Sequence, residues 1–230
     1  ERKLKGIIFL GGWFSHDEKR LKQINVPFVL STISMFEGVD KKIYSSVSVD
    51  DVKESKKAVD CLCEYGHEKI VMLAAQPWDE SISGLRVQGY KKALEERQIP
   101  INENLIRYTF QEETAFTMEN GYKLMKELLE SDEEFTAVYA ISDSMAIGAS
   151  KAILESGKKI PEDYSVMGFD GLDIAYYYNP SISTIRQPVE DMAKETSKIL
   201  FDLIENNDDN RHKIFDGELV VRQSVVRLNK

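Results

Sequence analysis

Short apolar runs alternate with longer amphipathic stretches along most of the chain. The runs have the length of strands buried on both faces of a parallel sheet, whereas the longer stretches repeat their apolar residues at helical spacing. Strands are predicted at residues 5–10, 26–30, 44–49, 70–74, 105–110, 137–141 and 165–169, and a last extended stretch at 213–222. Helices are predicted at residues 17–24, 54–64, 85–97, 116–129, 144–155 and 190–205. This alternation is typical of βαβ units, so the predicted fold class is α/β with parallel sheets.

The strand predicted at residues 165–169 leads into a carboxylate, Asp170, with Gly168 before it and Gly171 after it. Ligands of open parallel α/β sheets bind at the carboxyl ends of the strands. Because the two glycines allow close approach of a backbone or a ligand, Asp170 is placed to accept hydrogen bonds from hydroxyl or amine donors. The alternative is an aspartate that only caps the following turn.

Other polar or aromatic residues also follow predicted strands, where a parallel sheet gathers them along one edge. They are Trp13, Thr32, Arg86, Phe116, Ser142 and Asp143. A ring, a guanidinium and carboxylates together suit a sugar-like ligand, because the ring covers C–H groups while the charged groups bind hydroxyls. Phe116 could instead pack in the core, and Arg86 could form a surface ion pair with Glu80. Asp143 could be a helix N-cap.

Composition and charge exclude several functions for this chain. The 230 residues carry a net charge of −9 and no long basic run, so we expect the chain alone not to bind DNA, which requires concentrated Lys and Arg. No apolar run approaches the ~20 residues of a membrane span, and the first run is too short for a signal peptide, so a cytoplasmic location is expected. Cys61 and Cys63 are expected to be reduced packing residues. We find none of the common catalytic or metal-binding motifs, so we expect that the chain is not an enzyme and binds neither a cofactor nor a metal.

A series of motifs, taken in order, resembles the lactose/galactose-repressor family of bacterial transcription regulators. The motifs lie at residues 47–50 (VSVD), 65–70 (YGHEKI), 83–90 (SGLRVQGY), 142–149 (SDSMAIGA), 160–166 (IPEDYSV), 168–170 (GFD), 180–188 and 222–224 (RQS). The resemblance extends over essentially the whole chain. It implies two Rossmann-like subdomains of the type I periplasmic-binding-protein kind, joined by three crossovers. The N-terminal subdomain is expected to comprise residues 1–50 and 186–213, and the C-terminal subdomain residues 51–185 and 214–230.

The same resemblance assigns roles to individual residues. The family's guanidinium, carboxylate and stacking aromatic that bind the effector fall on Arg86, Asp170 and Phe116. Two further ligand positions fall on Thr32 and Ser142. Glu80 stands at a position that varies between members, and Trp13 completes the expected ligand-binding set. Asp143 falls on a structural aspartate at a helix start, which favours the N-cap interpretation. We expect Arg86→Ala to weaken effector binding about ten- to a hundredfold and to leave the melting temperature of the ligand-free protein nearly unchanged.

The chain also departs from the resembling family. The family's helix-turn-helix, hinge helix and first two βα units have no counterpart, because residues 5–10 already match a strand from the middle of the first subdomain. A subdomain without those strands should expose an apolar edge.

The resemblance implies the effector-binding and dimerisation core of a transcription repressor. A small sugar-like effector would bind in the inter-subdomain cleft, and closure would act on operator DNA through a helix-turn-helix module that this sequence lacks. The alternative is a free-standing sugar-binding protein of a transport system. We expect a homodimer formed by side-by-side contact of both subdomains, with the helices predicted at 17–24 and 144–155 as candidate contacts; core packing explains their apolar faces equally well.

Overall fold

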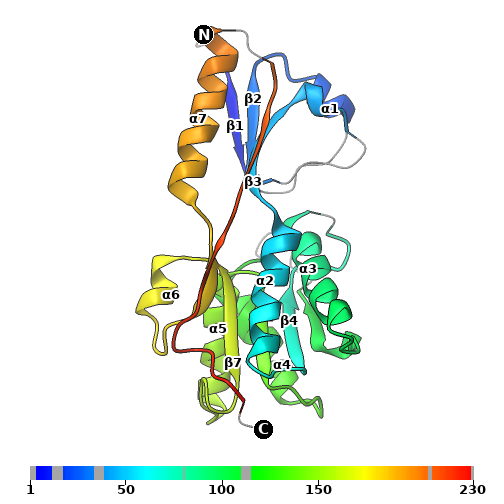
Figure 1. The fold of residues 1–230 in the computed structure, drawn as a ribbon, viewed down its shortest axis with the longest axis vertical. Coiled ribbons are helices and arrows are strands. Elements are labelled where there is room, and N and C mark those ends of the chain that lie inside the picture. Colours follow the sequence, from blue (N-terminus) through cyan, green and yellow to red (C-terminus); the bar gives the residue numbers. More distant parts are fainter. Residues whose placement is uncertain are drawn as a thin grey trace. The chain divides into compact units, whose positions relative to one another are not determined.

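The computed structural model describes residues 4–11, 18–33, 39–79, 81–109, 115–206 and 209–228. The chain forms two compact units (Figure 1). Unit 1 comprises Glu1–Asp50 and Pro188–Asp216, and unit 2 comprises Asp51–Gln187 and Gly217–Lys230. The chain therefore passes between the units three times. The first crossing lies at 50/51, and the others lie at 187/188 and 216/217 rather than at the expected 185/186 and 213/214.

Unit 1 is built on a parallel sheet with the strand order β1-β2-β3-β9. Its elements are β1 Ile7–Leu10, α1 Glu18–Lys22, β2 Phe28–Ser31, the 3-10 helix η1 Lys41–Ile43, β3 Ser45–Val49, α7 Val189–Glu205 and β9 His212–Phe215. Helices α1 and α7 lie on opposite faces of the sheet (Figure 1). Leu21 of α1 joins Phe28 and Leu30 of β2 in one apolar cluster. On the other face, α7 buries Met192 and Ile199 against the sheet at helical spacing.

The first strand of unit 1 has an exposed apolar side. Among the described strands, β1 pairs only with β2 and is an edge of the sheet. Ile8 is 37% exposed and Leu10 is 77% exposed, whereas their neighbours Ile7 and Phe9 pack on the cluster around Leu21. The expected apolar edge is therefore present.

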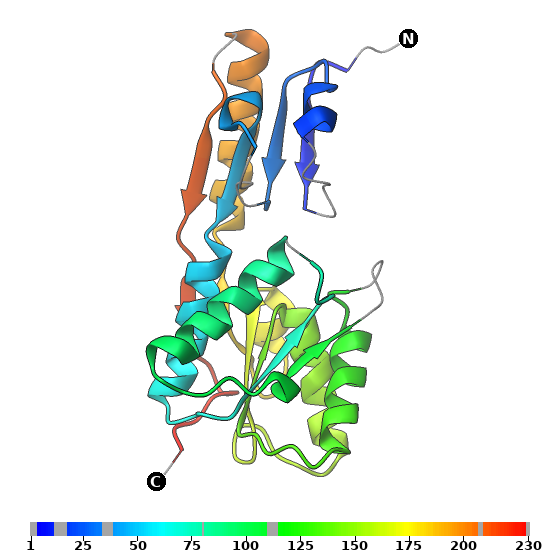
Figure 2. The ribbon, with the colours of Figure 1, turned by 90° about the vertical axis from the view of Figure 1, so that its right-hand side faces the viewer.

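Unit 2 is built on a six-stranded sheet with the order β10-β8-β7-β6-β4-β5, in which only β10 runs antiparallel. The strands are β4 Ile70–Ala74, β5 Ile106–Tyr108, β6 Ala137–Ala140, β7 Ser165–Asp170, β8 Ser183–Arg186 and β10 Glu218–Val220. The helices are α2 Asp51–Glu64, α3 Ile82–Glu96, the 3-10 helix η2 Glu103–Leu105, α4 Met118–Leu129, α5 Asp143–Glu155 and α6 Asp173–Tyr177. Helices α2 and α3 cover one face of the sheet and α4 and α5 the other (Figure 2). The predicted α/β fold with parallel sheets is confirmed.

The strand order places a topological switch point inside unit 2. After β4 the chain goes to β5 on one side, and the next strand, β6, then pairs with β4 on the other side. The loops that leave β4 and β6 therefore diverge to opposite faces of the sheet. Ligands of doubly wound sheets bind in the crevice that such loops form at the carboxyl ends of the strands.

Every helix within the described ranges is too short or too polar to span a bilayer. The two cysteines lie on α2; Cys61 is buried and Cys63 half-buried, and neither forms a disulfide. Burial raises the pKa of each thiol to about 11, so both are protonated, as expected of packing residues.

Candidate functional site

The guanidinium of Arg86, on α3, is the centre of a buried polar network in unit 2. Its side chain is 5% exposed, and its Nε donates to Asp51 Oδ1 at 2.9 Å. Its Nη1 donates to the carbonyl of Ile141 at the end of β6 and lies 3.4 Å from Asp170 Oδ1. The guanidinium also stacks on the ring of Phe169, with Cζ 3.5 Å from the ring centroid. Burial opposes the charge of Arg86, but the two carboxylates outweigh it and raise the pKa of the guanidinium.

Asp170, at the end of β7, is the partly exposed member of this network. Its side chain is 26% exposed, and its Oδ1 accepts a hydrogen bond from Gln187 Nε2 at 2.9 Å. The Gln187 N–H also donates to the Asp170 carbonyl at 3.1 Å, which fixes the backbone on both sides. Burial raises the pKa of Asp170, and the charge of Arg86 opposes that rise. A carboxylate held at this edge can accept hydrogen bonds from ligand hydroxyls.

The turn after Asp170 is clamped by Asp143. The Asp143 Oδ2 accepts from the N–H groups of Gly171, at 2.8 Å, and Leu172, at 2.7 Å. Gly171 has φ +80°, and a Cβ on Gly168 would collide with Asp143 Oδ1, so this turn depends on both glycines. Burial raises the pKa of Asp143 to about 7, although hydrogen bonds, first that of the Thr184 hydroxyl, oppose the rise.

The N-cap interpretation of Asp143 is wrong. The cap of α5 is Ser142, whose Oγ accepts from Met145 N–H at 3.2 Å, while Asp143 is the first helical residue and its carboxylate reaches the loop after β7. Ser142 is 3% exposed, and its hydroxyl also donates to the Phe116 carbonyl at 3.5 Å. The cap and the candidate ligand position are therefore the same residue.

Phe116 precedes α4, which begins at Met118 rather than at Phe116. The residue is 39% exposed, so the core-packing alternative does not hold for it. Arg86 pairs with Asp51 and Asp170 in the interior, and the surface ion pair considered as its alternative would involve Glu80, which lies outside the described residues.

Thr32 lies in unit 1, at the end of β2. Its φ is +61°, a conformation that is rare for a β-branched residue. Its N–H donates to the Val47 carbonyl at 2.8 Å, which holds it in place. Within the described ranges only Thr32, Gln98 and Asp170 have positive φ among residues other than glycine. Two of the three are candidate ligand residues, and strain of this kind is typical of functional sites.

The structure thus brings Arg86, Asp170, Ser142 and the Phe116 carbonyl together at the carboxyl edge of unit 2, around the end of β6. Trp13 and Glu80 lie outside the described residues. Asp51 and Gln187 are not among the ligand residues predicted from the sequence, although Gln187 belongs to a motif of the resembling family. The signal for both is their position beside the crossings at 50/51 and 187/188.

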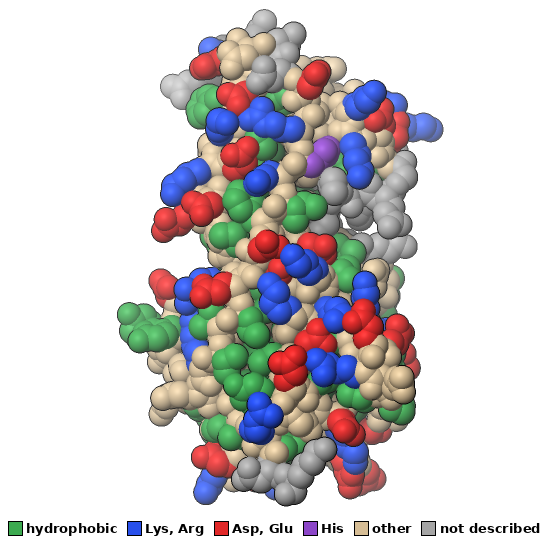
Figure 3. All heavy atoms as spheres, in the orientation of Figure 1, with side chains coloured by type: hydrophobic (Ala, Val, Ile, Leu, Met, Phe, Trp, Pro, Cys, Tyr) green, Lys and Arg blue, Asp and Glu red, His purple; other side chains and the backbone are tan. Residues whose placement is uncertain are grey.

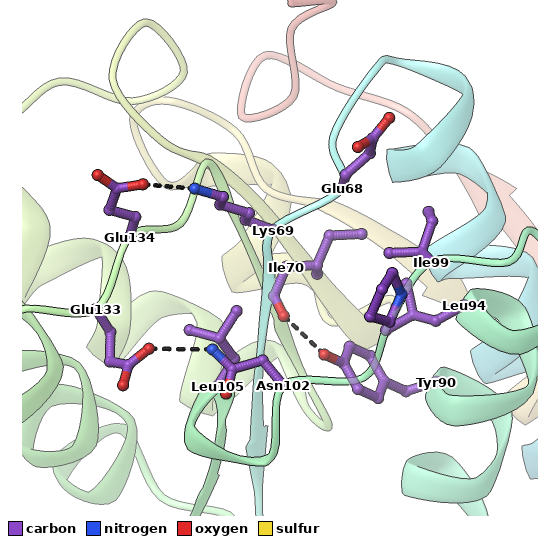
Figure 4. Close-up of a pocket in the computed structure, with 11 residues that line it drawn as sticks. Glu68, Lys69, Ile70, Tyr90, Leu94, Ile99, Asn102, Leu105, Glu133 and Glu134 are labelled. Atoms are coloured by element: carbon purple, nitrogen blue, oxygen red, sulfur yellow. Dashed lines mark hydrogen bonds and ion pairs between the residues drawn. The ribbon is translucent and has the colours of Figure 1, made fainter.

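A second concave region lies at the amino ends of β4 and β5. This cavity of about 440 Å³ is lined by Glu68, Lys69, Ile70, Tyr90, Leu94, Ile99, Pro100, Asn102, Leu105, Glu133 and Glu134 (Figure 4). Lys69 points to Glu134, and Asn102 donates to Glu133 at 3.1 Å. None of the predicted ligand residues lines it, and it lies at the end of the sheet where ligands of this architecture do not bind.

In the described part of the chain, no three His, Cys, Asp or Glu side chains group closely enough to hold a metal ion.

Comparisons with known sequences identify the family to which this chain is related. The sequence profile of the periplasmic binding protein-like domain matches residues 59–225. The HTH-type transcriptional regulator MalR of Clostridium butyricum is 40% identical over 229 residues, which are 99% of this chain and 67% of that regulator. Three further curated regulators are matched over 58% to 63% of their own length. The chain therefore spans about three fifths to two thirds of these relatives.

Solved structures agree. The cellobiose complex of the transcriptional regulator CelR has a TM-score of 0.85 at 29% identity, over 96% of this chain and 66% of that chain. A LacI family transcriptional regulator from Enterococcus faecium with bound ribose has a TM-score of 0.82 at 29% identity, over 98% of this chain and 81% of that chain. The chain therefore belongs to the periplasmic binding protein-like domain family and to the LacI family of bacterial transcription regulators, of which its two units form the effector-binding core.

Proposed function

We propose that this chain binds a small neutral sugar as the effector of a bacterial repressor. One observation carries the proposal: a partly exposed carboxylate, Asp170, is held by a buried guanidinium, Arg86, at the carboxyl edge of the unit 2 sheet. Hydroxyl groups are the ligands that such a carboxylate recognises, because it accepts charge-assisted hydrogen bonds, and a ligand that re-orients Arg86 would also receive hydrogen bonds from the guanidinium. The solved relatives with cellobiose and ribose support a sugar.

Effector binding would change the populations of conformations that differ at the three crossings between the units. Asp51 and Gln187 stand beside two of those crossings and hold the two candidate ligand residues. A ligand that re-orients Arg86 or Asp170 would therefore act on the crossings through one hydrogen bond each. In the whole protein, this change would alter operator binding by a helix-turn-helix module in the cytoplasm. The curated relatives are transcription regulators, which favours this role over that of a sugar-transport protein.

We also propose that the chain forms a homodimer through α6. The contact helices expected from the sequence do not fit, because α1 buries its Leu21 and otherwise presents charged residues, and α5 packs most of its apolar residues inward. Exposed apolar side chains instead gather on and before α6; they are Leu172, Ile174, Tyr176 and Tyr177, at 40%, 48%, 59% and 81%. Hydrophobic side chains project at the left edge over α6 in Figure 3. An apolar patch of this kind marks an interaction surface, and a second copy is the simplest self-complementary partner.

Thermal shift with named sugars tests the effector proposal. The ligand-free chain would be melted with ribose, cellobiose, maltose, glucose and galactose at millimolar concentration. We expect at least one sugar to raise the melting temperature. The Asp170→Asn variant should lose most of that shift, and Asp132→Asn, an exposed aspartate outside the network, should keep it. A panel without any shift, or an equal shift in both variants, would contradict the proposal.

A further inference from the structure

Gln76 occupies the switch point of the unit 2 sheet. It lies two residues beyond the end of β4, in the loop that leads to α3. Leu73 of β4 pairs with Ala140 of β6, and the Leu73 carbonyl accepts from Ile141 N–H at 3.0 Å, so the two strands end side by side. The Ile141 carbonyl in turn accepts from Arg86. Gln76 therefore leaves the sheet beside the strand end that holds the candidate effector site.

The Gln76 side chain is buried and has no hydrogen-bond partner among the described residues. It is 1% exposed, and this holds for both its Oε1 and its Nε2. Its backbone is fixed, because its carbonyl accepts from Asp79 N–H at 3.1 Å. The preceding Ala75 N–H donates to Ser83 Oγ at 2.9 Å, which ties the loop to the same helix that carries Arg86. The loop therefore holds this amide in the interior.

A buried amide without partners is unfavourable, because it has lost its hydrogen bonds to water. Such groups are rare in folded proteins, and each requires a cause. An amide offers one acceptor oxygen and two donor hydrogens, the complement of two neighbouring sugar hydroxyls, each of which both donates and accepts. A site built to bind hydroxyls also rejects analogues that lack them, because its polar groups are then left unpaired.

We propose that Gln76 is a specificity-determining residue of the effector site and that its amide binds two hydroxyl groups of a sugar. This inference rests on the proposed function, because it assigns Gln76 to the same ligand as Arg86 and Asp170. Gln76 lies outside the set of ligand residues predicted from the sequence. In the ligand-free protein, the buried amide of Gln76 is expected to lower the free energy of unfolding.

Gln76→Met tests the proposal, because methionine has a similar size and shape but no amide. Gln88→Met is the matched control, since Gln88 lies on α3 and is exposed. Calorimetric affinity would be measured with whichever sugar of the panel gives the largest wild-type shift, and with its monodeoxy analogues. We expect Gln76→Met to weaken binding of the parent sugar at least roughly tenfold and to leave or raise the ligand-free melting temperature. It should also lose discrimination against one deoxy analogue. Gln88→Met should change none of these.

The ligand-free measurement tests the inference without any sugar. If Gln76→Met lowers the ligand-free melting temperature or fails to fold, the amide is a structural group, for example one paired through an ordered water, and the inference is wrong. If the variant binds the parent sugar and its deoxy analogues like wild type, Gln76 is not at the site, while the proposed function stands. If wild-type protein binds no sugar, the proposed function fails and this inference fails with it.

Discussion

At the scale of single residues, burial determines whether a charged side chain pairs within the protein or is available to a ligand. The place of Arg86 after a strand predicts a ligand position, and the structure keeps it at the carboxyl edge of the sheet. Its guanidinium is nevertheless enclosed by Asp51, the Ile141 carbonyl and the Phe169 ring, and only Asp170 beside it is partly exposed. The sequence shows which residue types follow the strand ends. It does not show which of these residues pair in the interior, because pairing depends on tertiary contacts between α2, α3 and β7.

This burial changes the prediction for Arg86→Ala. The ligand-free melting temperature should not stay unchanged, because the substitution leaves the buried Asp51 carboxylate without its guanidinium partner. We expect a loss of about 3–5 kcal/mol in the free energy of unfolding, besides weaker sugar binding. Arg97→Ala is the control, since Arg97 pairs with Asp60 at 2.9 Å on a partly exposed surface and should cost under about 1 kcal/mol. Equal losses in urea titrations of the two variants would contradict the buried-pair interpretation.

Asp143 predicts a pH dependence of stability. Its pKa is raised by burial to about 7, above the ordinary 3.8, so the folded state holds a proton that the unfolded state has already released. The resulting stabilisation is fully present below about pH 4 and is lost as the pH rises to about 7. The Asp143→Asn substitution would remove this titration, while the amide oxygen of the new side chain could still accept from Gly171 and Leu172.

We therefore expect Asp143→Asn to gain stability relative to wild type between about pH 5 and pH 8. The gain should grow by about 2–3 kcal/mol over that range, since burial moves the pKa from 3.8 to about 7 and one pKa unit corresponds to about 1.4 kcal/mol. Melting curves of both proteins across that range measure it. Parallel curves would show that Asp143 does not titrate there.

At the scale of elements, hydrophobic periodicity predicts the long helices and the buried strands, and it fails where an element is short. It predicts neither the strand β8, Ser183–Arg186, nor the helix α6, Asp173–Tyr177. Four residues with serine and threonine carry no clear period, and five residues do not complete two helical turns. The stretch 213–222 is predicted as one extended segment, yet it forms β9 in one unit and β10 in the other. Only pairing with β3 and β8 distinguishes these two strands.

Alanine substitutions at the N-caps of two helices in unit 2 can distinguish a structural role from a ligand-binding role. Ser142 Oγ caps α5, and Asn102 Oδ1 accepts from Asn104 N–H at 3.0 Å to cap η2 at the opposite end of the sheet. Each substitution to alanine should cost about 1 kcal/mol of stability. If Ser142 also binds the effector, only Ser142→Ala should weaken sugar affinity in calorimetry. Equal affinities in the two variants would leave Ser142 as a cap alone and remove it from the ligand set.

At the scale of the whole molecule, charge and exposed apolar surface indicate different partners. The net charge of −9 opposes nucleic acid, so residues 1–230 alone should not retain an operator fragment in a salt-dependent, sequence-specific way. Filter binding at low and moderate salt measures this. Specific retention that weakens steeply with salt would show that these residues contact DNA themselves.

The apolar surface around α6 indicates a protein partner instead. Tyr176 and Tyr177 pack edge to face, with ring centroids 5.0 Å apart, and the Arg222 guanidinium lies 5.4 Å from the centroid of the Tyr176 ring. Tyrosine and arginine are the residue types that contribute most to interface energies. Their clustering on one short helix favours a central contact, because isolated apolar residues elsewhere on a surface need no partner.

The double substitution Tyr176→Ser, Tyr177→Ser should convert the proposed homodimer to a monomer without unfolding the chain, because both residues are mainly exposed. Sedimentation velocity at tens of micromolar protein measures the change, and thermal melting verifies the fold. Phe201→Ser on α7 is the control, since this ring is 59% exposed but belongs to unit 1, outside the α6 patch. It should leave the dimer intact. A wild-type monomer would contradict the homodimer. Dissociation by Phe201→Ser but not by the double substitution would place the contact elsewhere, because an interface centred on α6 requires the tyrosine pair to supply most of the affinity.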